Sequence, residues 1–148
     1  MTVTTHPEAA PTIAPALVGI HHLGLTVRNV DASESWYVAV LGMARVFVEP
    51  HPSGGGHTVV MTRPGTALFF GLDHHPQADL QPFDARRSGL DHLALRVGSR
   101  SDLDAWVVHL DAIGIAHGSI HENAEPALAS LVLHDPDGIP IELFWSEA

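Results

Sequence analysis

The sequence predicts an α+β protein made of two tandem modules, each with the element order β-α-β-β-β. The first observation behind this prediction is an internal repeat: residues 19–38 match residues 89–108 at an offset of seventy positions. The second is the apolar period within each copy, which changes from two residues to about 3.6 and so indicates a strand followed by a helix. Seven residues of the first copy are identical in the second: Gly19, His22, Leu23, Leu25, Val27, Trp36 and Val38.

The first module spans residues 17–72 and begins with a predicted strand over 20–27, because apolar and polar side chains alternate there. His22 lies on the face opposite the leucines. Asp31, followed by a glutamate three residues later, resembles a capping box and predicts a helix that ends at Gly42. Three further runs have strand character: 44–49, 57–62 and 67–72.

The second module, residues 88–146, repeats this order after a polar linker at 73–87. It begins with a predicted strand over 90–97. A helix follows, predicted to be capped by Ser101 and closed by Gly114. Three more strands are predicted at 115–121, 128–133 and 139–145.

Neither module is large enough to cover both faces of its own sheet, which predicts that the two act together. We expect a single domain over 17–148, in which the curved sheets enclose a cleft. Residues 1–16 contain three prolines and four alanines without an apolar period, which predicts a mobile tail.

Composition excludes several kinds of chemistry. The chain of 148 residues has no cysteine, and its seven basic residues are all arginine, so thiolate nucleophiles and lysine Schiff bases are ruled out. A net charge of -10 disfavours a nucleic-acid partner, because the phosphate backbone would be repelled. The chain also has no apolar run long enough to span a membrane and no secretion signal at its start, so we expect a cytoplasmic protein.

The strongest candidate site is a set of two histidines and one glutamate. His22 and His92 occupy equivalent places in the two copies, each on the polar face of a predicted strand. Glu142 lies on the polar face of the last predicted strand, where an unpaired carboxylate would be costly to bury. Two neutral imidazoles and one carboxylate suit a divalent transition metal and leave coordination positions open.

The ordered combination of motifs resembles the vicinal oxygen chelate superfamily, which includes glyoxalase I, extradiol dioxygenases, fosfomycin-modifying enzymes and bleomycin-binding proteins. The motifs that carry the resemblance are the histidine segments 22–27 and 89–95, Ser35-Trp36-Tyr37, Leu41-Gly42 and the final segment 135–143. The resemblance extends over about residues 18–146. It implies a homodimer and a single divalent ion, Fe, Mn, Ni, Co or Zn, bound by His22, His92 and Glu142. Substrates would chelate that ion through two neighbouring oxygens.

One position departs from the glyoxalase I pattern. That enzyme takes a fourth ligand from the last strand of the first module, where alignment of the two turns places Phe69 or Phe70 opposite Glu142. Neither side chain binds a metal. Asp73 and His75 follow on the same strand and are candidates for the mouth of the cleft. The remaining three ligands look more like those of fosfomycin transferases and extradiol dioxygenases.

Candidate substrate contacts follow from the same faces. Arg96 shares a face with His92 and is a candidate for an anionic substrate group, while Thr26 and Phe69 are candidates from the first module. Glu142 is also the candidate catalytic carboxylate, in addition to its role as a ligand.

Three functions remain open at this point. The first is glyoxalase-like lyase or isomerase chemistry with the metal as a Lewis acid. The second is an iron(II) extradiol-type dioxygenase, against which the position of the sole tyrosine, Tyr37, on a helix counts. The third is a metal-free drug- or metabolite-binding protein of the bleomycin-resistance type, against which the retention of all three ligand positions counts. Whether the site lies within one chain or across a dimer also remains open.

Overall fold

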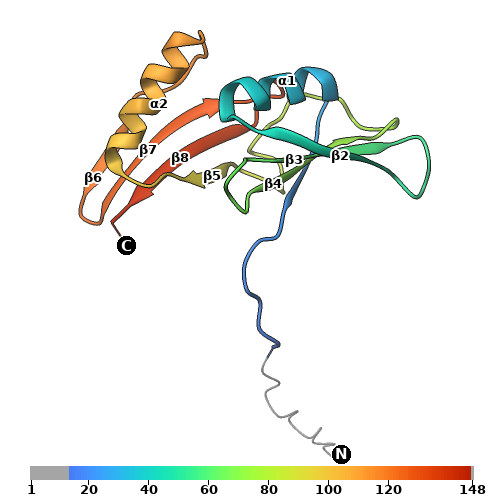
Figure 1. The fold of residues 1–148 in the computed structure, drawn as a ribbon, viewed down its shortest axis with the longest axis horizontal. Coiled ribbons are helices and arrows are strands. Elements are labelled where there is room, and N and C mark those ends of the chain that lie inside the picture. The colour runs from blue at the N-terminus through green and yellow to red at the C-terminus, as the bar shows by residue number, and fades with distance from the viewer. Residues whose placement is uncertain (1–13, 148) are drawn as a thin grey trace, which may run out of the picture.

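A computed structural model describes residues 14–147 and contains two copies of the predicted β-α-β-β-β order (Figure 1). The first copy consists of β1 (Leu23–Thr26), α1 (Val30–Leu41), β2 (Ala44–Pro50), β3 (His57–Thr62) and β4 (Phe69–His74). The second consists of β5 (Leu93–Arg96), α2 (Arg100–Ala112), β6 (His121–Ala124), β7 (Ala127–His134) and β8 (Pro140–Ser146). Residues 1–13 of the predicted tail lie outside the described residues, and residues 14–22 are exposed and form no regular element. No helix between residues 14 and 147 is long and apolar enough to cross a membrane.

Each module folds into a mixed four-stranded sheet with the same strand order. In the first sheet the order is β1-β4-β3-β2, and in the second it is β5-β8-β7-β6. The first strand of each module runs parallel to the last, and the other pairs are antiparallel. The predicted α+β class is therefore confirmed. The two sheets stay separate in the described part of the chain, so they do not close into one continuous sheet around a cleft.

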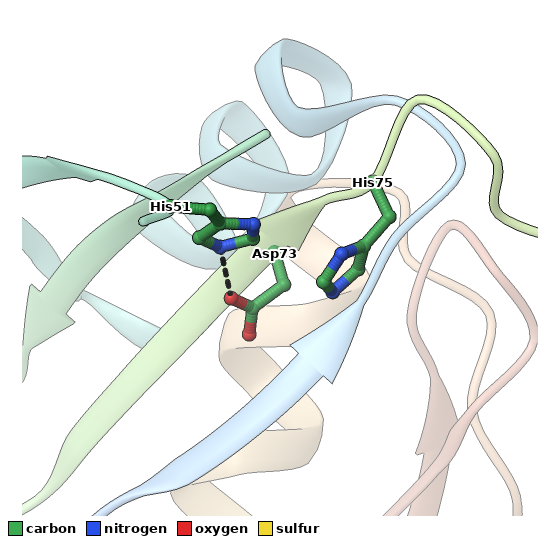
Figure 2. Close-up of side chains that lie close together, drawn as sticks. All are labelled: His51, Asp73 and His75. Atoms are coloured by element: carbon green, nitrogen blue, oxygen red, sulfur yellow. Dashed lines mark hydrogen bonds and ion pairs between the residues drawn. The ribbon is translucent and has the colours of Figure 1, made fainter. Parts of the chain in front are cut away.

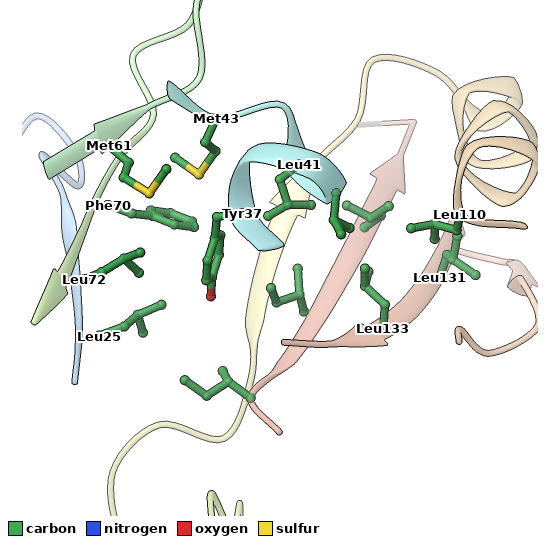
Figure 3. Close-up of a cluster of buried hydrophobic side chains, with 14 of the residues drawn as sticks. Leu25, Tyr37, Leu41, Met43, Met61, Phe70, Leu72, Leu110, Leu131 and Leu133 are labelled. Carbon is green, nitrogen blue, oxygen red and sulfur yellow. The ribbon is translucent and has the colours of Figure 1, made fainter. Parts of the chain in front are cut away.

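The core runs through both modules, with α1 between them. Tyr37 and Leu41 on α1 are buried and lie between the apolar face of the first sheet and that of the second (Figure 3). The ring of Tyr37 packs edge-on against Phe70 of β4, with ring centroids 5.7 Å apart. Burial of these large side chains stabilises the assembly of the modules, because each removes apolar surface from water.

Polar contacts at the β7–β8 turn join the two modules. Asp137 in this turn accepts a hydrogen bond from Arg28 Nε at 2.6 Å, and Arg28 Nη2 donates to the carbonyl of Pro136 at 2.8 Å. The hydroxyl of Tyr37 donates to Asp135 at 3.1 Å. Both aspartates are buried, and each therefore needs these donors. The turn of the second module is thus held by the first.

The predicted helix starts are wrong by two residues in both modules. Asn29 caps α1 and accepts a hydrogen bond from the N–H of Ala32 at 3.0 Å, in place of Asp31. Ser99 caps α2 and forms a capping box with Asp102, in place of Ser101. Asn29 and Asp31 are both acceptable capping residues for α1, and so are Ser99 and Ser101 for α2. The extended backbone that a cap requires is found at Asn29 and Ser99.

Two predicted strands also differ from the structure. The segment 115–121 forms only an isolated bridge between His117 and Leu133, and β6 begins at the last residue of this segment, His121. Strand β4 begins two residues later than predicted and continues to His74. The pairing of each strand with its neighbour sets these limits, and apolar periodicity within a single segment cannot specify that pairing.

Candidate functional site

The two repeated histidines directly precede the first strand of their modules. His22 stands before β1 and His92 before β5, and both side chains are exposed. The strands predicted over 20–27 and 90–97 are therefore shorter than expected, and neither histidine lies within one. The duplication nevertheless places both histidines at equivalent positions of equivalent sheets.

The strand register identifies the counterpart of Glu142 in the first module. Ala94 pairs with Glu142 in the second sheet, and its equivalent Gly24 pairs with Gly71 in the first. The expectation that Phe69 or Phe70 stands opposite Glu142 is therefore wrong. Six residues separate β3 from β4 and five separate β7 from β8, so aligning the turns shifts the comparison by one position. Gly71 offers no side chain to a metal, so this position supplies no fourth ligand.

His92 and Glu142 form a pair on one face of the second sheet. His92 Nε2 lies 3.7 Å from Glu142 Oε2, and the side chains are 48% and 22% exposed. His92 Nδ1 lies 2.6 Å from Asp91 Oδ1. This hydrogen bond raises the pKa of His92, and the charge of Glu142 adds to the rise. Because a carboxylate only accepts, it holds the Nδ1–H tautomer of a neutral His92 and leaves Nε2 available as a ligand.

His22 lies apart from that pair. Its Nδ1 is 2.9 Å from Nδ1 of His21, whose ring stacks on Phe69 at a centroid distance of 6.3 Å. Between residues 14 and 147, no group of three ligand atoms within 4.8 Å of one another includes His22, His92 or Glu142. The chain therefore brings together two of the three predicted ligands and presents the third on its other sheet.

The predicted substrate contacts lie in separate places. Arg96 lines a cavity of about 770 Å³ between the end of α1 and α2, together with Arg63 and Trp106. Thr26 lines a smaller cavity of about 200 Å³ beside the β7–β8 turn. Phe69 stacks on His21. In the described part of the chain, Arg96 and Thr26 therefore line different cavities, and Phe69 lines neither of these two.

A second cluster of ligand-type side chains lies in the first module, formed by His51, Asp73 and His75 (Figure 2). Their ligand atoms all lie within 4.8 Å of one another, and His51 Nε2 is 3.2 Å from Asp73 Oδ1. The sequence pointed to Asp73 and His75 but missed His51. No spacing pattern signals this contact, because it depends on how the loop after β2 folds back toward β4.

Comparison with known proteins gives consistent results. The family model described as Glyoxalase/Bleomycin resistance protein/Dioxygenase superfamily matches residues 19–143. The uncharacterized protein YaeR of Escherichia coli is 27% identical over 84% of this chain and 94% of its own length. Biphenyl-2,3-diol 1,2-dioxygenase of Sphingomonas paucimobilis is 30% identical over 88% of this chain, which spans 40% of that enzyme. The crystal structure of a glyoxylase/bleomycin resistance protein/dioxygenase domain from Frankia sp. EAN1pec superimposes with a TM-score of 0.78. It is 30% identical and covers 89% of this chain and 100% of its own.

Proposed function

Because the chain belongs to the Glyoxalase/Bleomycin resistance protein/Dioxygenase superfamily, we propose that it is a divalent-metal-dependent enzyme with His22, His92 and Glu142 as ligands. The observation that carries the proposal is the His92–Glu142 pair, whose donor atoms lie 3.7 Å apart on one sheet face. An imidazole nitrogen and a carboxylate oxygen at this separation fit ligation of a common ion. The Asp91 hydrogen bond supports the fit, because outer partners of this kind orient ligand histidines.

We further propose that the site is completed in a homodimer. His22 is exposed and stands on the sheet that does not carry His92 and Glu142. A two-fold axis that brings the partner subunit's His22 to this pair places the reciprocal residues together as well. Such a dimer holds two equivalent sites, each with ligands from both chains.

The proposed chemistry is glyoxalase-like lyase or isomerase chemistry on a small molecule bound through two neighbouring oxygens. When bound, the ion supplies Lewis acidity that stabilises negative charge on those oxygens. Glu142 would serve as a ligand and would accept a proton that leaves the substrate. Arg96, two residues after the strand partner of Glu142, is the proposed source of positive charge for an anionic substrate group.

A dioxygenase is the second candidate, supported by the 30% identity with biphenyl-2,3-diol 1,2-dioxygenase. The environment of Tyr37 counts against it. This sole tyrosine is fully buried, and its hydroxyl donates to Asp135 in the core, so it is not available as an acid beside a bound catechol. We therefore place lyase or isomerase chemistry first.

Metal analysis of the purified protein tests the proposal. We expect bound ion in the wild type and in His134→Ala, an exposed histidine that is not one of the proposed ligands, and loss of that ion in His92→Ala and Glu142→Ala. Binding unchanged in both ligand variants refutes the proposed site. Reconstitution with iron(II) under anaerobic conditions then separates the candidates, because oxygen uptake with catechols selects the dioxygenase and turnover of thiol adducts of methylglyoxal selects the lyase.

A mixing experiment tests the shared site. His22→Ala and Glu142→Ala proteins each lack a ligand at every site, but a mixed dimer contains one intact site. We expect random subunit exchange to restore about one quarter of the wild-type sites. A site within one chain gives no recovery on mixing.

A further inference from the structure

The side chains of His51, Asp73 and His75 come from three points of the first module. His51 directly follows β2, Asp73 lies in β4, and His75 directly follows β4. Figure 2 shows the three side chains facing one another across a small gap. The His51 and His75 rings are 4.7 Å apart between centroids. Within the described chain this is the group in which three ligand atoms of histidine and carboxylate lie within 4.8 Å of one another.

The surroundings hold two of these side chains in place. His51 Nε2 lies 3.0 Å from the hydroxyl of Thr58, which itself donates to Asp73. Strand pairing fixes Thr58 opposite Asp73. The backbone N–H of His51 donates to the carbonyl of Gly56 at 2.9 Å, which closes the loop that carries the imidazole. His51 and Asp73 are 16% and 20% exposed, so the cluster is half-buried, whereas His75 is exposed.

We propose that His51, Asp73 and His75 form a second site for a divalent transition metal, distinct from His92 and Glu142 and complete within one chain. Two imidazoles and one carboxylate are the ligand set of open zinc sites, in which water or a small ligand takes the remaining position. Asp73 provides the negative charge, and imidazole ligands select zinc, nickel or copper over magnesium or calcium. The bound ion ties the loop 51–56 to the end of β4.

Thr58 is the positioning residue of this site. Its hydroxyl donates to the Asp73 carboxylate and is also within hydrogen-bond distance of His51. Outer-shell partners of this type hold ligands in register, and their loss typically weakens metal affinity by about 10–100-fold. We therefore expect Thr58→Val, which keeps the shape of the side chain, to weaken metal binding by about that factor without abolishing it.

The test is zinc titration of the full chain by calorimetry at about pH 7.5, because metal binding requires deprotonated ligands and is favoured above acid pH. To keep the two sites separate, the titration is carried out in the Glu142→Ala background as well as in the wild type. We expect His75→Ala and Asp73→Asn to lose one zinc equivalent per chain in both backgrounds. Because His75 is exposed, its replacement leaves the fold intact, and thermal unfolding without metal verifies this.

His74→Ala is the matched control. His74 lies between the two ligands in sequence, and its ring packs against His57 at a centroid distance of 5.3 Å. We expect its zinc stoichiometry and affinity to equal those of the parent. The proposal is overturned if His75→Ala and Asp73→Asn bind as much zinc as the parent. It is also overturned if His74→Ala loses as much zinc binding as these two variants. Glu142→Ala removes only the proposed catalytic ion. Titrations in this background therefore test the second metal site independently of the proposed catalytic site.

Discussion

The hydrogen bond between Tyr37 and Asp135 joins the two modules, and its removal should destabilise the protein measurably. Both side chains are buried: Tyr37 is fully inaccessible and Asp135 is 5% exposed. Asp135 Oδ1 accepts from the backbone N–H groups of Asp137 and Ile139 at 2.9 and 2.8 Å, while Oδ2 accepts from Tyr37 at 3.1 Å. Tyr37→Phe therefore leaves one oxygen of a buried carboxylate without this donor and keeps the ring packing.

The expected cost is about 1.5–3 kcal/mol, the range for hydrogen bonds to charged groups. For a protein of this size 1 kcal/mol corresponds to a change in Tm of about 2–4 °C, so Tm should fall by roughly 3–12 °C. Urea unfolding followed by tryptophan fluorescence measures the free energy of unfolding directly. Because Trp36 adjoins Tyr37, the signal reports on this region.

The cost should also depend on pH. Burial raises the pKa of Asp135, while the hydrogen bonds from Ile139, Tyr37 and Asp137 oppose the rise. A carboxyl whose pKa is raised on folding contributes its stability below its unfolded pKa and loses it as pH rises through its folded pKa. Tyr37→Phe removes a donor to the charged form and raises that pKa further. The variant should therefore lose more stability at neutral pH than at acid pH, where Asp135 is protonated.

The paired control is Asp135→Asn, which keeps the side-chain shape and an oxygen for the two backbone donors. In this background Tyr37→Phe should cost less, because no buried charge depends on the hydroxyl. The difference between the two costs is the coupling energy. A cost below about 0.5 kcal/mol at neutral pH, or equal costs with and without the Asp135 charge, refutes the reasoning.

Two further predictions concern the helices and the core. Ser99→Ala should lower the free energy of unfolding by about 0.5–2 kcal/mol because it removes the cap of α2, whereas Ser101→Ala should change it by less than about 0.5 kcal/mol. Equal losses of stability in Ser99→Ala and Ser101→Ala, measured by urea unfolding, would show that Ser99 is not the cap of α2. Leu131→Ala should cost about 2–5 kcal/mol because its side chain is fully buried, whereas Val108→Ala, which is 69% exposed, should stay within about 0.5 kcal/mol of the wild type. Similar losses of stability in the two variants would contradict the assigned core.

The features that the sequence predicted correctly are those encoded within one segment. Alternation in the first strand placed Leu25 in the core and Thr26 on the exposed face, as observed. Gly42 ends α1 with φ of 63°, a conformation that favours glycine. The prediction that the two modules share one architecture is also confirmed, since the two sheets have the same strand order. Each of these features follows from a period or a residue type that does not depend on distant partners.

The features that the sequence missed depend on pairing between segments. The β3–β4 connection is one residue longer than the β7–β8 connection. Gly71, and not Phe69 or Phe70, therefore occupies in the first sheet the position that Glu142 occupies in the second. The contact between His51 and Asp73 requires the loop after β2 to close as well. Neither can be read from local periodicity, because a shift of one residue changes which side chains face each other.

Gly71 is closely packed at the position that Glu142 occupies in the second module. An ideal Cβ at Gly71 lies 2.8 Å from Cγ2 of Thr58, so the absence of a side chain at Gly71 leaves room for the Thr58 methyl group. A glutamate at Gly71, which would restore the pattern of Glu142, would therefore require the Thr58 side chain to move. Because Gly71 provides no carboxylate beside β1, the proposed site on His22 takes its carboxylate from a second module.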